Sequence, residues 1–398
     1  MPKADYKDGQ FENIREKTDI TQLARAVEEA FDECGDPRDP GRCIYPAWYL
    51  ILILIMATMV GEGTVKDIAA WAHCNEDLLK EISKGKWGAP SYTALWYFLV
   101  RLTVRTLKEL ISQWMNKLPE GVRSKIYAID GKEVRAAGKN GPKVQLVGLY
   151  ATDSGILITS ERVPKKKAEP IALPSLLKAV DIAGALVTMD AAYAHAKDLK
   201  EVTSRGADYI IAIQANQPTL PAEVTALFEQ AAAAGDVYAP LNVAVSKDSK
   251  HGRLEEREVA VSHDTQWLAG GASKDYTDWE IKSLIRVRRG RSVQGKNTLS
   301  EVHYASSRRL TADEAAKAIR GHWGIEHGEH YVLDVVWNED SSRTNTGHAA
   351  ENLAHLRRAA RNLVAVADPN RGFAAAKRAA RYCRDDLVGL IRNLLIQE

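Results

Sequence analysis

Residues 125–134 read KIYAIDGKEV, a short apolar run that ends on a carboxylate and is followed by glycine and lysine. The β-branched and aromatic residues at its start predict a buried strand. Asp130 then stands at the end of that strand, where an ionised carboxylate is costly unless it has a partner. A divalent ion is such a partner, and oxygen ligands suit Mg²⁺ or Mn²⁺. We therefore expect the rest of the chain to bring further carboxylates to Asp130.

A second stretch repeats this pattern, because residues 185–190 read ALVTMD and end on Asp190. If the two strands are neighbours in one sheet, their carboxylates lie side by side and repel each other unless cations neutralise them. Two divalent ions about 3.5–4 Å apart drive in-line displacement at phosphorus. One ion activates the attacking water or 3′-hydroxyl, and the other stabilises the leaving oxygen. The pattern thus predicts a two-ion site for phosphodiester chemistry.

A third carboxylate is expected from a helix beside the sheet, and the candidates are Glu314, Glu326, Glu329 and Asp334. Glu326 is favoured because it lies in the aromatic segment RGHWGIEH at 320–327. His322, Glu326 and His330 are spaced by four and would share one helical face. That spacing alone would suggest a zinc site, but no H-E-x-x-H motif is present. Glu329 and Asp334 stay open as alternatives.

The order of the expected elements indicates an α/β protein with a mixed sheet. Residues 1–118 are mostly helical and are expected to form a DNA-binding or associated domain, and 119–236 alternate strands with helices. Residues 237–306 alternate at period two and are expected to form an all-β insertion, whereas 307–398 return to helices. Thr311 with Glu314 forms a capping box at the start of these helices.

The most apolar segment, residues 44–60, reads IYPAWYLILILIMATMV. Its 17 residues are at the short limit for a membrane span. We favour a helix buried at the centre of the N-terminal helical domain, with a membrane span as the alternative. The polar N-terminus is unlike a signal peptide, and the four cysteines form no C-x-x-C pair. Both features predict a cytoplasmic protein.

The net charge of +2 means that a nucleic-acid face must come from local clustering. Between residues 282 and 309 there are eight Lys or Arg but only Glu301 as an acid, which favours a phosphate-contacting surface. For Trp267 and Trp279 nearby, core packing is favoured over stacking on an extruded base. The candidate DNA-binding residues are Lys132, Arg286, Arg288, Arg289, Arg291, Arg320, His322 and Trp323.

Several blocks, taken in order, resemble the H-repeat-associated family of bacterial insertion-sequence transposases of the DDE type. The blocks in the second part of the chain are AIDGK, VTMDA, GADYIIAIQANQPTL, HGRLEEREVAVS, HWGIEH, VLDVVWNEDSSR and NLAHLRRAARNLV. The N-terminal blocks DPRDPGR, AAWAHCNEDLLKEI and APSYTALWYFLVRL resemble the domain that precedes the catalytic one in this family. The resemblance covers about residues 30–365.

This resemblance implies an RNase H-like fold with an all-β insertion before the catalytic glutamate. It implies a catalytic, metal-binding triad of Asp130, Asp190 and Glu326, and two Mg²⁺ or Mn²⁺ ions. The implied activity is cleavage and strand transfer of element ends, and the implied partner is double-stranded DNA, bound by a homodimer. No membrane or small-molecule substrate is expected, and a bacterial, nucleoid-associated location is implied.

Three residues depart from the family pattern: His327 stands for the usual asparagine, His195 for glutamine and Gln214 for lysine. None of them removes an expected metal ligand. They leave room for an alternative, in which the chain is a domesticated or immobile relative that binds DNA or acts as a nuclease.

Overall fold

The structure is a computed structural model, and its contacts divide the chain into two compact units. The first comprises residues 1–122, 133–145 and 327–398, and the second comprises 123–132 and 146–326. The residues that the structure describes are 25, 28–29, 36, 38–39, 41, 43–116, 124–134, 144–165, 168–214, 217, 219–234, 241–250, 253–269, 276–293 and 296–395.

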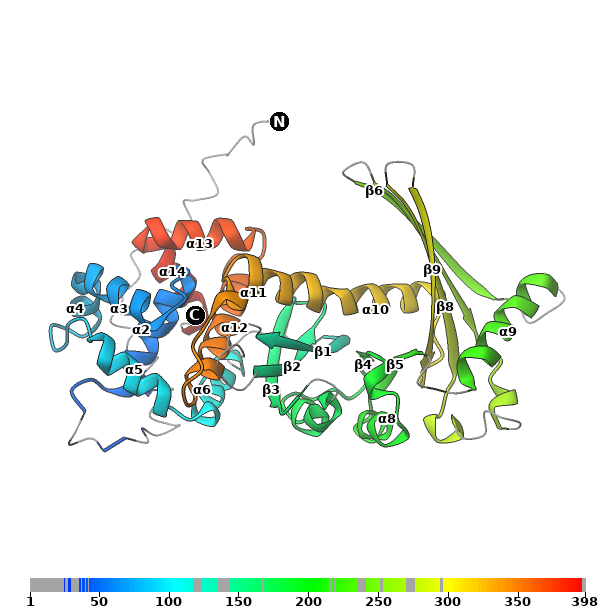
Figure 1. The fold of residues 1–398 in the computed structure, drawn as a ribbon, viewed down its shortest axis with the longest axis horizontal. Helices are drawn as coiled ribbons and strands as arrows, with labels where there is room; N and C mark the ends of the chain where they lie inside the picture. The colour runs from blue at the N-terminus through cyan, green and yellow to red at the C-terminus, as the bar shows by residue number, and fades with distance from the viewer. Residues whose placement is uncertain are drawn as a thin grey trace. The chain divides into compact units, whose positions relative to one another are not determined.

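The second unit is built on one nine-stranded sheet with the strand order β3-β2-β1-β4-β5-β9-β8-β7-β6 (Figure 1). β4 is parallel to both β1 and β5, whereas β9 runs antiparallel to β5. The strands are β1 (Ile126–Val134), β2 (Val144–Ala151), β3 (Ile156–Val163), β4 (Leu186–Met189), β5 (Asp208–Ile213), β6 (Asn242–Lys250), β7 (Arg253–Ser262), β8 (Ser283–Val293) and β9 (Lys296–Ser306). The expected mixed sheet is therefore present.

Period-two alternation sends the side chains of the central strands to two different cores. Tyr127, Val187 and Ile211 pack on one face with the helices that follow β3, β4 and β5. These are the short 3₁₀ helices η6 (Glu169–Ala172) and η7 (Ala191–Tyr193), with α7 (Leu173–Leu177), α8 (Ala196–Thr203) and α9 (Leu220–Ala234). The opposite face holds Ile126 and Leu186 against α10 (Ala312–Ile325). Apolar strands buried on both faces are typical of parallel sheets.

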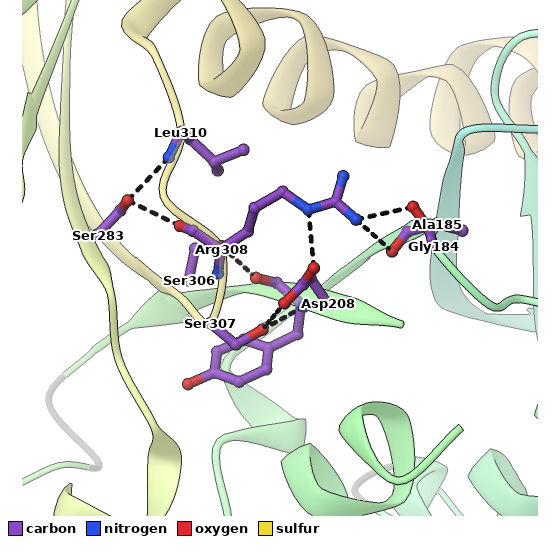
Figure 2. A network of polar contacts seen from close by, with 9 residues as sticks. Gly184, Ala185, Asp208, Ser283, Ser306, Ser307, Arg308 and Leu310 are labelled. Atoms are coloured by element: carbon purple, nitrogen blue, oxygen red, sulfur yellow. Dashed lines mark hydrogen bonds and ion pairs between the residues drawn. The ribbon is translucent and has the colours of Figure 1, made fainter. Parts of the chain in front are cut away.

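The β-rich segment continues the same sheet, because β9 pairs with β5 and leads through β8 and β7 to β6. A polar network closes this junction (Figure 2). Arg308 Nε lies 2.7 Å from Asp208 Oδ2, and Arg308 Nη2 donates to the carbonyl of Gly184 at 2.7 Å. Ser307 Oγ donates to Asp208 Oδ1 at 2.7 Å. Arg308, one of the cations in the basic segment, thus joins strand ends inside the unit.

The first unit is helical, and α2 (Ala47–Met59) lies in its core. All 13 residues of α2 are buried, as expected of a helix that is apolar all round. The interpretation of this segment as a buried helix is confirmed. Nowhere in the described residues is a helix both long and apolar enough to cross a membrane.

The other helices of this unit surround α2 in one apolar cluster. They are α3 (Val65–Cys74), α4 (Glu76–Ile82), α5 (Tyr92–Arg101), α6 (Val104–Asn116), α11 (Tyr331–Val335), α12 (Ala349–Ala367), α13 (Phe373–Tyr382) and α14 (Arg384–Leu395). Trp337 Nε1 donates to the carbonyl of Thr58 at 3.0 Å, so the C-terminal part of the chain completes the N-terminal core.

Candidate active site

Asp130 lies in the middle of β1, so the expectation that it stands at the end of its strand is wrong. Asp190 directly follows β4, the parallel neighbour of β1. Ile129 of β1 is in register with Met189 of β4, and each aspartate is the next residue in the chain. The two side chains share the sheet face that α10 covers, since Ile126 and Leu186 on that face lie an even number of residues before them. The structure therefore brings the two aspartates side by side.

A backbone amide holds one oxygen of each carboxylate. Gly131 N donates to Asp130 Oδ1 at 2.7 Å, and Ala192 N donates to Asp190 Oδ1 at 2.9 Å. The second bond makes Asp190 the N-cap of η7. Ala191 and Ala192 after Asp190 allow this tight turn, whereas Gly131 after Asp130 continues strand β1. The carboxylates are thus oriented by the backbone before any ligand binds.

Helix α10 runs over these strands in step with β4. Ile319 belongs to the apolar cluster over the start of β4, and one turn later His322 Nδ1 lies 3.0 Å from the Thr188 hydroxyl. Glu326 follows His322 by four residues as the C-cap of α10, and its carboxylate is close enough to influence the pKa of His322.

The hydrogen bonds of Thr188 fix the tautomer of His322. The Thr188 hydroxyl donates to the carbonyl of Tyr127 at 3.1 Å. Because a threonine hydroxyl has one hydrogen, both of its bonds form only when His322 donates from Nδ1. Nε2 of His322 is then an acceptor. Burial lowers the pKa of His322, and the nearby carboxylate of Glu326 opposes that shift.

A small cavity of about 120 Å³ lies beside Asp190. Besides Asp190, its lining includes His322 and Trp323 from α10 and Tyr304 from β9. Asp190 and Glu326 are exposed and Asp130 is half-buried, so solvent and ligands can reach the carboxylates. The cavity places aromatic and imidazole groups next to one of the two aspartates.

The donor set of these carboxylates fits a hard divalent ion, because Mg²⁺ and Mn²⁺ prefer carboxylate oxygens. However, within the described ranges no three His, Cys, Asp or Glu side chains come together as a metal-binding group. The structure thus sets Asp130 beside Asp190, whereas Glu326 does not converge with them on one point.

The expected single face for His322, Glu326 and His330 is wrong. Residues Glu326–His330 form a π-helix, and its wider turn breaks the four-residue spacing after Glu326. His330 Nε2 lies 3.6 Å from Glu329 Oε2, while His322 binds Thr188. These contacts give no support to a His/Glu zinc site.

Glu329, one of the two alternative carboxylates, belongs to a buried ionic cluster in the helical unit. Glu329, 1% exposed, lies 3.2 Å from Nε of Arg358, and Glu339, fully buried, lies 2.8 Å from its Nη1. Burial opposes the charge on Arg358, but Glu339, Glu329 and, more weakly, Asp334 outweigh it and raise the pKa of the guanidinium. Glu329 and Asp334 thus stabilise a buried cation, which favours Glu326 as the third carboxylate.

Three of the four candidate arginines on β8 are ion-paired across the sheet. The pairs are Arg286–Glu258 at 2.9 Å, Arg288–Glu301 at 2.6 Å and Arg289–Glu255 at 2.9 Å. Two of these acids come from β7, outside the segment in which the positive charge was counted. Arg291 is exposed, and in the described part of the chain it has no ion pair. DNA contact stays a prediction for this strand and is best supported for Arg291.

The other candidate DNA-binding residues have different surroundings. Lys132 is 7% exposed, and Arg320 lies 3.6 Å from Asp248 with most of its side chain in solvent.

Trp323 lies under two guanidinium groups, because Arg257 Cζ is 4.6 Å and Arg289 Cζ is 4.7 Å from its ring centroid. Such contacts stabilise by about 0.5–2 kcal/mol each. Trp323 therefore ties α10 to β7 and β8.

Sequence reasoning missed Thr188. It also missed Glu255 and Arg257 of β7, which form an ion pair with each other. The period-two alternation of side chains along a strand could have indicated Thr188, since it is the only polar residue of β4 on the Asp190 face. The charges of the LEEREV stretch are evident from the sequence, but their partners on β8 depend on the register of β7 with β8.

Trp279 is buried and Trp267 packs against the same core, so core packing is confirmed for both.

Comparison with known proteins gives matches over most of the chain. The family model described as "Transposase DDE domain" matches residues 122–363, and the one described as "DDE_Tnp_1-associated" matches residues 28–115. "Putative transposase YncI" of Escherichia coli O157:H7 is 26% identical over 362 residues, covering 86% of this chain and 88% of the relative. "H repeat-associated putative transposase YhhI" of Escherichia coli K12 is 28% identical over 326 residues, covering 79% and 84%.

Among solved structures, a chain of the piggyBac transposase synaptic complex with hairpin DNA is similar to this chain with a TM-score of 0.42. The two are 9% identical, and the match covers 95% of this chain and 78% of that one.

Proposed function

Because the chain belongs to the family of transposase DDE domains, we propose that it is a DNA transposase whose divalent ions are held by Asp130, Asp190 and Glu326. The observation that carries this proposal is the register of β1 with β4, which sets two carboxylates side by side at the centre of the sheet. The strands β3-β2-β1-β4-β5 are, in this proposal, the RNase H-like core that the family resemblance implies.

In the proposed reaction, bound divalent ions supply Lewis-acid activation of the attacking oxygen and stabilise the leaving oxygen. The chain contributes orientation: the amides of Gly131 and Ala192 fix one oxygen of each aspartate. His322, held by Thr188, presents Nε2 as an acceptor beside the cavity next to Asp190. No side chain forms a covalent bond to DNA in this scheme. Water attacks in the cleavage step, and the freed 3′-hydroxyl attacks in strand transfer.

The test is incubation of the full chain with DNA carrying the sequences that flank its gene, in Mg²⁺, in Mn²⁺ and in EDTA. We expect cleavage at the ends of those sequences with either ion, then joining to a target duplex, and no reaction in EDTA. Cleavage without joining would favour the alternative of an immobile nuclease, to which the departures His195, Gln214 and His327 are relevant. Binding without any cleavage under all conditions would contradict the proposal.

Binding of double-stranded DNA follows from this function, and two element ends held together imply a homodimer. We propose that Arg291 and Arg320 contact phosphates. Both are exposed: Arg291 has no ion pair in the described residues, and Arg320 is only loosely associated with Asp248. Arg286, Arg288 and Arg289 instead hold the strands β7, β8 and β9 together.

We predict that Arg291→Gln lowers the slope of log Kd against log salt concentration by about one, because one phosphate contact is lost. Fluorescence anisotropy from 50 to 200 mM salt measures this slope. The matched control is the double variant Arg288→Gln with Glu301→Gln, which removes an ion pair without changing net charge. Its slope is expected to equal that of the wild type. An unchanged slope for Arg291→Gln would exclude this residue from the interface.

A further inference from the structure

The cavity beside Asp190 has the size of a small water site. Its volume of about 120 Å³ has room for a few water molecules, each of which takes about 30 Å³ in the liquid. A nucleotide, with its base, sugar and phosphate, cannot be enclosed in this volume. The cavity lining combines apolar with polar side chains, which include Ile210, Ala212 and Ile319 among the apolar ones and Thr188, Asp190, Tyr304 and His322 among the polar ones.

The short side chain of Ala212 leaves this hollow open. Ala212 of β5 pairs with Tyr304 of β9. On the other side of β5, Ile211 pairs with Met189, the residue before Asp190. Ala212 therefore lies between Asp190 and Tyr304, and its methyl group fills little of the space between their larger side chains.

The polar groups of the lining match the hydrogen bonds of one water molecule. His322 offers Nε2 as an acceptor, because its Nδ1 donates to the Thr188 hydroxyl at 3.0 Å. Asp190 offers a carboxylate, which also accepts. Burial raises the pKa of Tyr304 to about 12, so its hydroxyl keeps a hydrogen to donate. Two acceptors and one donor suit the two hydrogens and a lone pair of water, and a buried water makes about three hydrogen bonds.

The sheet fixes the imidazole of His322 before DNA binds. The Thr188 hydroxyl donates to the carbonyl of Tyr127 in β1 at 3.1 Å and accepts from His322 of α10. Thr188 itself is 2% exposed and lies in β4. The orientation of the ring therefore follows from two neighbouring strands and needs no ligand.

We propose that the cavity beside Asp190 binds the water that attacks DNA in the cleavage step, and that His322 Nε2 orients this water as a hydrogen-bond acceptor. This inference rests on the proposed function and names the place of one nucleophile in it. The 3′-hydroxyl that attacks in strand transfer belongs to a nucleotide, which the cavity cannot enclose. His322 and the cavity are therefore expected to serve cleavage and not joining.

The experiment compares two single-turnover assays of the full chain in Mg²⁺, cleavage of uncut DNA and joining of ends that are supplied already cleaved. We expect His322→Asn to slow cleavage about 100-fold, as misplacement of a reacting group can, and to change joining less than about twofold. Ala212→Val, which adds two methyl groups to the cavity, should show the same selectivity. His73→Asn, at an exposed position of α3, is the matched control for the loss of an imidazole and should change neither rate.

Glutamine at position 322 separates the acceptor from the bond to Thr188. The asparagine amide can still donate to Thr188 in place of Nδ1, but asparagine has no atom in the place of Nε2. Glutamine can set its amide oxygen there, but it loses the bond to Thr188. His322→Gln should therefore cleave at least about tenfold faster than His322→Asn. The opposite order would show that the bond to Thr188 is what matters, and it would overturn the inference.

DNA affinity without metal separates a contact with water from a contact with DNA. Fluorescence anisotropy in EDTA should give His322→Asn and Ala212→Val the same Kd as the wild type, because neither side chain touches DNA in this proposal. A weaker affinity for either variant, at an unchanged melting temperature, would make the cavity part of the DNA interface and overturn the inference.

The wild type distinguishes the failure of this inference from the failure of the proposed function. A wild-type chain that neither cleaves nor joins DNA would refute the proposed function itself. If the wild type does both, but His322→Asn and Ala212→Val slow the two reactions equally or slow neither, only the place of the attacking water is refuted.

Discussion

Asparagine in place of Asp130 or Asp190 is expected to reduce Mg²⁺-dependent DNA cleavage at least about 1,000-fold, which corresponds to about 4 kcal/mol of transition-state stabilisation. The substitution removes a charged oxygen ligand but keeps a carbonyl oxygen. That oxygen can still accept from Gly131 N or Ala192 N, as the aspartates do at 2.7 and 2.9 Å. These backbone contacts should therefore persist. Single-turnover cleavage rates, with melting temperatures alongside, measure the effect.

The same assay identifies the third carboxylate. Glu326 is exposed, so Glu326→Gln should lose cleavage with little change in melting temperature. Glu329 is buried against Arg358, so Glu329→Gln should instead lower the melting temperature. Exposed Glu229→Gln should change neither. Full cleavage by Asp130→Asn, Asp190→Asn or Glu326→Gln would contradict the proposed triad at that position.

Methionine in place of Arg358 is expected to destabilise the helical unit by about 3–5 kcal/mol, because it leaves buried carboxylates without a cation. Arg358 is 4% exposed and bridges Glu329 to Glu339, at 3.2 and 2.8 Å. The loss exceeds that of a typical surface change, which is within about 0.5 kcal/mol. Urea unfolding followed by far-UV circular dichroism, which reports mainly on the helices, measures it. Arg378→Met, at an exposed position of α13, is the matched control.

A triple variant tests the physical reason for this loss. If stranded negative charge causes it, replacing Glu329 and Glu339 with leucine in the Arg358→Met background should recover most of the stability, since apolar replacements of buried ionic groups are often neutral or stabilising. A triple variant that is no more stable than Arg358→Met alone would show that lost packing of the long arginine side chain is responsible.

Local patterns were sufficient to predict the elements that hold the aspartates. The apolar strand that ends just before Asp190, and the capping box of Thr311 with Glu314, depend on residues a few positions apart, and the structure confirms both. The strand that carries Asp130 was predicted as well, but it continues to Val134 instead of ending at the aspartate. The buried helix α2 was predictable for the same reason, because a segment that is apolar all round has no face for solvent. Each of these features is encoded within one short window.

The features that sequence reasoning missed depend on contacts between distant segments. The net positive charge around β8 was overestimated, because Glu255 and Glu258 of β7 neutralise two of its arginines. The sequence does not show these pairs, since they depend on the register of β7 with β8. The π-helix after Ile325 was not expected, since a regular four-residue spacing predicts an unbroken α-helix. For the arginines of β8, partners on another strand decide the outcome.

The seam between β5 and β9 sets an order of events during synthesis. Tyr209 and Ser306 are bonded across it although they are 97 residues apart. At about 5–20 residues per second, roughly 5–20 s pass between the emergence of these two strands from the ribosome. During that interval the edge of β5 is unpaired in the nascent chain, and an unpaired edge is open to pairing with other chains. Glu326 is translated later still, so the growing polypeptide carries both aspartates for a period before it can complete the carboxylate set.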